Sequence, residues 1–199
     1  YAAPFALIYL FILNQIFKLP LPVPNTDFIF FGIIGGVTQI IATALLVYLF
    51  SFRNFAVGTA YSKTETAQTA VFGLIILGDT LTTGAIIGIM ISLSGVMAIS
   101  TARQGAGFKN LFQSLLQRTA LIGLASGAMF GISAISYRAA SLSLGGEGVL
   151  VQASYTLACV TILQTLLMTA YLKVKEPGQI VSVIKNWRVA ILVGLSGMI

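Results

Sequence analysis

The sequence predicts an all-α integral membrane protein, built as a polytopic helix bundle. Of its 199 residues, 57% are hydrophobic and only 8% are charged, whereas soluble domains carry about 25% charged residues. Apolar runs of roughly membrane-spanning length recur from one end of the chain to the other. Several such runs in one chain indicate several crossings. We therefore expect a multi-pass membrane protein embedded in the lipid bilayer.

Composition also excludes several classes of site. The sequence has no histidine and a single cysteine, Cys159, so it cannot form an intrachain disulfide, a CxxC site or a histidine-based catalytic or metal site. The net charge of +6 comes from basic residues scattered among loops, without a basic face that alternates with aromatics. We therefore expect no nucleic-acid partner, no metal and no cofactor.

Charged and proline-rich stretches divide the chain into six nearly complete spans and a short seventh, as in a fragment of a longer protein. The first two spans cover 1–17 and 28–52. The sequence LPLPVPNTD separates them, and three prolines within five residues prevent a helix from continuing. Asp27 is expected to cap the second span.

The third and fourth spans, 55–78 and 81–101, meet at the sequence GDT. Gly78 is expected to end one helix, and Asp79 or Thr80 to cap the next. The segment 102–118 is too polar to cross a membrane, but its apolar residues recur at helical spacing. It is predicted to be an amphipathic helix in the interface; a helix packed on its own protein is the alternative.

The fifth and sixth spans cover 119–144 and 149–172. Gly123, Gly127 and Gly131 recur every four residues in the fifth span, and such a ridge lets a neighbouring helix approach closely. A second interfacial candidate, 179–188, leads into the seventh span. Basic residues accumulate in 102–118 and 173–188, so these loops are predicted to be cytoplasmic.

Two glycine motifs lie five spans apart. FFGIIGG at 30–36 opens the second span, and LVGLSG at 192–197 opens the seventh. A repeat of five helices has an odd number of crossings, so its two copies are inverted in the bilayer, as in many secondary transporters.

The stretch 50–100 resembles the paired helices that end each half of EamA-type transporters, in the drug/metabolite transporter superfamily. The family's "lGE-x-lt" turn corresponds here to LGDTLT at 77–82, followed by Gly88 and Gly95. Asp79 replaces the usual Glu, and YSKTE stands where family members more often carry apolar residues and a proline.

The resemblance implies ten helices in two inverted five-helix repeats, and a bacterial inner (cell) membrane location. This chain would then hold the end of the first repeat at 1–101, a linker at 102–118 and the start of the second repeat at 119–199. Family members commonly keep both termini in the cytoplasm, which conflicts with the loop charges.

Lys63 and Glu65 lie in the middle of the third span, where an ionised side chain that faces lipid costs about 2.5 to 3.5 kcal/mol. At about 100° per residue they point some 200° apart, so they cannot pair along one helix face. The strip Tyr61, Glu65 and Gln68 is the better candidate for lining a polar cavity. The alternative is that Lys63 and Glu65 each have a structural partner on another helix.

Four further polar residues could line the same cavity: Gln39, Gln152, Tyr155 and Gln164. Each could instead make an interhelical hydrogen bond. Together with the resemblance and the inverted five-span spacing, these residues predict a secondary active transporter of a small metabolite that works by alternating access, coupled to a proton or another cation. A membrane enzyme is disfavoured because the five acids are far apart. A non-transporting helical scaffold is the remaining alternative, and a homodimer is left open.

Overall fold

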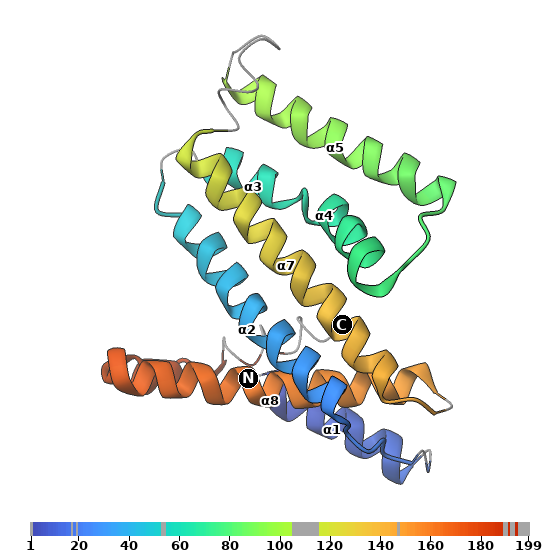
Figure 1. Ribbon diagram of the computed structural model, residues 1–199. Coiled ribbons are helices and arrows are strands. Elements are labelled where there is room, and N and C mark those ends of the chain that lie inside the picture. Colours follow the sequence, from blue (N-terminus) through green and yellow to red (C-terminus); the bar gives the residue numbers. More distant parts are fainter. Residues whose placement is uncertain are drawn as a thin grey trace. The chain divides into compact units, whose positions relative to one another are not determined.

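The computed structural model describes residues 2–16, 18, 20–52, 55–104, 116–146, 148–188, 191 and 194. Every regular element in these residues is a helix (Figure 1). Three helices are long and apolar enough to cross a membrane: α2 (Thr26–Leu49), α7 (Arg118–Ser143) and α8 (Val149–Lys175). The predictions of an all-α fold and of several helices able to cross a membrane are therefore confirmed.

Two other elements follow the predicted spans closely. Helix α1 (Ala2–Gln15) occupies the first span and α5 (Thr83–Gln104) the fourth. The short helix α9 (Pro177–Lys185) lies in the second interfacial candidate. Most of the predicted amphipathic linker lies outside the described residues, as does most of the glycine motif at 192–197.

The predicted third span is not one helix. It consists of α3 (Phe55–Ser62), α4 (Glu65–Phe72) and a π-helical turn, η1 (Gly73–Leu77), with a break at Lys63 and Thr64. The backbone N–H groups of Lys63 and Thr64 bond three residues back, to Ala60 and Tyr61. The expectation of a continuous helix over 55–78 was therefore wrong.

Hydroxyl groups at the break account for the interruption. Ser62 Oγ donates to the Thr59 carbonyl at 2.8 Å, and Thr64 Oγ1 donates to the Tyr61 carbonyl at 2.7 Å. Ser and Thr side chains that bond nearby carbonyls compete with the regular helical ladder. The polar run at 62–66 thus both carries the charges and ends α3.

The helix caps differ from those predicted. Asn25 rather than Asp27 caps α2, because its Oδ1 accepts from the Phe28 N–H at 2.7 Å. Asp27 lies in the first turn, where a negative charge suits the helix dipole.

The turn between η1 and α5 also differs in part from the prediction. Gly78 ends η1, as predicted, and has a φ of 67°. Thr82 caps α5, because its hydroxyl accepts from the Ala85 N–H at 3.2 Å. The loop continues past Asp79 and Thr80, so neither precedes the first helical turn.

The contacts divide the chain into two units, 1–36 with 137–199, and 37–136. In the first unit α1 packs along α8, and Asn25 Nδ2 donates to the Ser143 carbonyl at 2.6 Å. In the second unit α7 runs beside α3 and α4 (Figure 1).

The glycine ridge of α7 forms that contact, which confirms the predicted close approach. Gly123 faces the Gly58 carbonyl. A Cβ on Gly127 would lie 2.9 Å from the Ser62 carbonyl oxygen, and one on Gly131 would lie 3.0 Å from Thr69 Oγ1. Because these neighbours include main-chain atoms, the helices could not keep this separation with larger residues.

Gly127→Ala should therefore lower the midpoint of thermal unfolding of the detergent-purified protein. We expect a loss of about 1 to 3 kcal/mol, the usual cost of inserting a methyl group into a packed contact. Gly88→Ala is the matched control, since a Cβ at Gly88 meets nothing within 4 Å and alanine is the better helix former. Equal midpoints for the two variants would contradict the close packing of α7 on the break.

Candidate functional site

The break between α3 and α4 brings polar groups together inside an apolar segment. Thr64 is 8% exposed and Glu65 is half-buried, whereas Lys63 is exposed. Among the described residues, neither Lys63 nor Glu65 has an ion-pair partner. The two charged residues therefore lie in different surroundings, as the sequence predicted.

Gln68 lies one turn after the break and has a fixed amide orientation. Its Nε2 donates to Thr64 Oγ1 at 2.9 Å and to the Leu124 carbonyl on α7 at 3.4 Å. The Thr64 hydroxyl already donates to Tyr61, so it accepts from Gln68, and a carbonyl can only accept. Thr64 Oγ1 and the Leu124 carbonyl therefore both accept. The amide nitrogen of Gln68 must face these two oxygens, and Oε1 must point the other way.

Gln68 Oε1 is buried and has no hydrogen-bond partner within the described residues. A buried acceptor left unpaired costs about 1 to 3 kcal/mol. Such an atom calls for a donor, which a water molecule, a ligand group or a cation can supply.

The orphan oxygen faces the small residue at the centre of the glycine ridge. The position of a Cβ on Gly127 is 3.5 Å from Gln68 Oε1, 3.3 Å from the Glu65 backbone nitrogen and 2.9 Å from the Ser62 carbonyl oxygen. Backbone groups from the end of α3 and the start of α4 thus meet the Gln68 amide beside Gly127. A side chain at 127 would fill this space.

Tyr61 differs from Glu65 and Gln68 in its surroundings. It is 3% exposed and belongs to an apolar cluster with Val96 of α5 and Ala120 of α7, against which Leu124 packs. The break changes the rotation between positions 61 and 65, so the helical-wheel argument for one polar strip does not hold across it. Lys63, Glu65 and Gln68 are the predicted site residues at the break.

Gln39 lies elsewhere in the same unit. Its Oε1 accepts from Ser133 Oγ of α7 at 3.5 Å, so it makes the interhelical contact that the sequence left as an alternative. Gln164 in the first unit acts similarly, donating to the Tyr137 hydroxyl at 3.0 Å.

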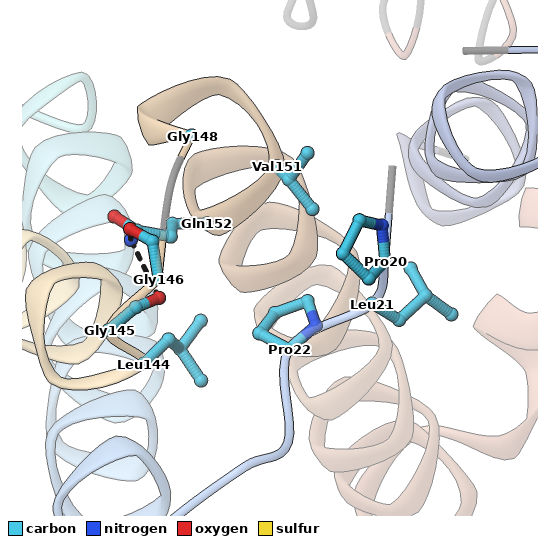
Figure 2. A pocket seen from close by; sticks show the side chains of 9 residues that line it. All are labelled: Pro20, Leu21, Pro22, Leu144, Gly145, Gly146, Gly148, Val151 and Gln152. Carbon is cyan, nitrogen blue, oxygen red and sulfur yellow. Dashed lines mark hydrogen bonds between the residues drawn. The ribbon is translucent and has the colours of Figure 1, made fainter. Parts of the chain in front are cut away.

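Gln152 lies in the first unit and stabilises the α7–α8 loop (Figure 2). Its Nε2 donates to the carbonyls of Gly145 and Gly146 at 2.8 and 3.1 Å. It borders a cavity of about 190 Å³ whose other walls are the loop glycines and mostly apolar side chains: Pro20, Leu21, Pro22, Leu144 and Val151. The amide N–H groups point at the loop, as Figure 2 shows, so a structural role explains Gln152.

Tyr155 also packs within the first unit. Its ring centroid lies 5.6 Å from that of Phe28 at an interplanar angle of 47°.

In the described part of the chain, no group of three Cys, Asp or Glu residues lies close enough together to hold a metal ion.

The sequence matches no family model, no curated protein and no solved structure. Membership of the EamA family therefore stays a prediction from the residues at 50–100.

Sequence reasoning named Glu65 and Gln68 as candidates, and both lie at the break, but it gave no role to Ser62, Thr64 and Gly127 there. The hydroxyls at 62 and 64 were visible as part of an unusually polar run, and their tendency to bond nearby carbonyls could have predicted the break. The place of Gly127 depends on which helix packs against α7, which spacing alone does not give.

Gln152→Leu should destabilise the protein without altering any response to ligand. The change leaves the Gly145 and Gly146 carbonyls without their donor, at a cost of about 1 to 3 kcal/mol. The measurement is the midpoint of thermal unfolding, with Gln117→Leu, at an exposed glutamine, as control. A Gln152→Leu protein as stable as the control would show that the loop does not depend on this amide.

Proposed function

We propose that this protein is a secondary active transporter of a small metabolite, of the drug/metabolite transporter type, that binds its ligand at the α3–α4 break. Gln68 Oε1, the buried acceptor without a partner at that break, is the observation that carries the proposal. On this view the chain is part of a ten-helix bundle of two inverted five-helix repeats.

The position of the break supports transport. If the segment enters the bilayer at Phe55, Lys63 lies about 12 Å along it at about 1.5 Å per residue, near the middle of a hydrocarbon core about 30 Å thick. Discontinuous helices in transporters bring backbone groups to this depth, where they bind substrate or coupling ions. Irregular backbone at this depth is tolerated where it is buried in protein or lines a cavity.

The chemistry of the break favours a ligand that donates hydrogen bonds or carries positive charge. Gln68 Oε1 and the Glu65 carboxylate are both acceptors, and Glu65 precedes Gln68 by three residues, on the same side of α4. An ammonium group, a metal cation or a proton held on Glu65 would each supply the donor or the positive charge that these two acceptors lack. Lys63, which is exposed, would attract an anionic part of the substrate or gate its path.

The alternative function, a scaffold without its own ligand, is favoured by the glycine ridge, because close helix packing also serves assembly. A scaffold gives no reason for an acidic residue one helical turn before a buried, unpaired amide oxygen. The two functions therefore differ in whether the break responds to a small molecule.

Thermal unfolding of the purified protein in the presence of amino acids, organic acids and cations tests the proposal. A ligand present at 100 times its dissociation constant stabilises the native state by about 2.7 kcal/mol. We expect one chemical class with a cationic or hydrogen-bond-donating group to raise the midpoint, and Glu65→Gln to abolish that shift. Glu176→Gln, at an exposed acid outside the break, is the matched control and should keep it.

Lys63→Gln refines the same experiment, since it should weaken anionic ligands selectively. No shift with any compound, combined with a marked loss of stability in Glu65→Gln alone, would overturn the transport proposal. That pattern would favour the scaffold, in which Glu65 stabilises the bundle.

A further inference from the structure

Helix α9 and the residues directly after it expose large apolar side chains. Val181 is 67% exposed, Ile184 is 65% exposed and Trp187 is 50% exposed. Val181 and Ile184 are three residues apart, so they lie on the same side of α9. A nine-residue helix with such a face does not bury it against the described part of its own chain.

Basic groups flank this apolar face. Lys185 ends α9, and the Arg188 guanidinium lies 5.6 Å from the centre of the Trp187 ring. Lys173 and Lys175 lie in the last turn of α8, immediately before α9. Glu176 is the one acid in the sequence between 173 and 188, so the segment is strongly positive.

The placement of α9 in the chain fits a bilayer surface. It begins at Pro177, directly after α8, a helix long and apolar enough to cross a membrane. Short helices with exposed apolar residues and a basic margin lie in the interface, where Trp favours the headgroup level. The loop charges also predict that 173–188 is cytoplasmic, and the cytoplasmic leaflet carries the anionic lipids.

We propose that α9 and Trp187 form a binding surface for anionic phospholipids. Val181, Ile184 and Trp187 enter the interface, and Lys185 and Arg188 contact lipid phosphates. Each basic residue near an anionic surface favours binding by roughly fivefold, so the pair should give roughly a 30-fold preference over neutral lipid. This proposal does not depend on the proposed transport site.

Trp187 is the one tryptophan of the chain, so its fluorescence reports on this surface alone. The whole chain is reconstituted into phosphatidylcholine vesicles with and without phosphatidylglycerol, each containing brominated lipid as quencher. We expect stronger quenching and blue-shifted emission in the anionic vesicles. At about 1 M salt, where the Debye length is about 3 Å, the difference should disappear.

The double variant Lys185→Gln, Arg188→Gln should lose the difference between the two lipid compositions, and Lys18→Gln, in another loop, should retain it. Comparing compositions within each variant removes the direct effect of Arg188 on the Trp187 ring. Equal quenching of the unaltered chain in both vesicles would overturn the proposal. Absence of quenching in both would also overturn it, and would indicate that protein covers the apolar face.

Discussion

The close backbone contact between α7 and the α3–α4 segment is the constraint on which the second unit depends. Gly123 faces the Gly58 carbonyl, and Gly127 faces the Ser62 carbonyl at the break itself. Because no side chain intervenes, the Leu124 carbonyl of α7 comes within reach of the Gln68 amide at 3.4 Å. That bond and the Thr64 hydroxyl orient the amide, and the orientation leaves Oε1 unpaired. A packing feature thereby determines the chemistry of the break.

The interruption of the third span also separates the two charged residues. Lys63 lies in the turn and is exposed, whereas Glu65 begins α4 and is half-buried. In a bilayer an isolated charge is costly wherever it meets hydrocarbon, so the two side chains require different compensation. Glu65 is the first residue of α4 and lies three residues before Gln68, on the same side of the helix. This asymmetry is why Glu65, rather than Lys63, is central to the proposed site.

Most of the fold followed from hydropathy, because α2, α7 and α8 are long enough for an apolar pattern to outweigh local effects. The break did not follow, since counting apolar residues ignores hydroxyls that bond carbonyls three residues back, as Ser62 and Thr64 do. The caps at Asn25 and Thr82 lie two or more residues from those expected, because a cap depends on the local backbone geometry. The role of Gln39 depends on Ser133, which is distant in sequence. The role of Gln152 depends on the carbonyl of Gly145, whose position is set by the conformation of a loop.

Chemical accessibility of position 65 in membranes tests the central claim most directly, because it requires no knowledge of the ligand. Cys159 is replaced by serine to remove the one native cysteine, and Glu65→Cys is treated with a charged methanethiosulfonate. Only a thiolate reacts, and a thiol in hydrocarbon stays protonated. The account predicts modification at 65, through an aqueous path to the break. An unreactive Cys at 65, in membranes where Asn110→Cys is modified, would contradict it.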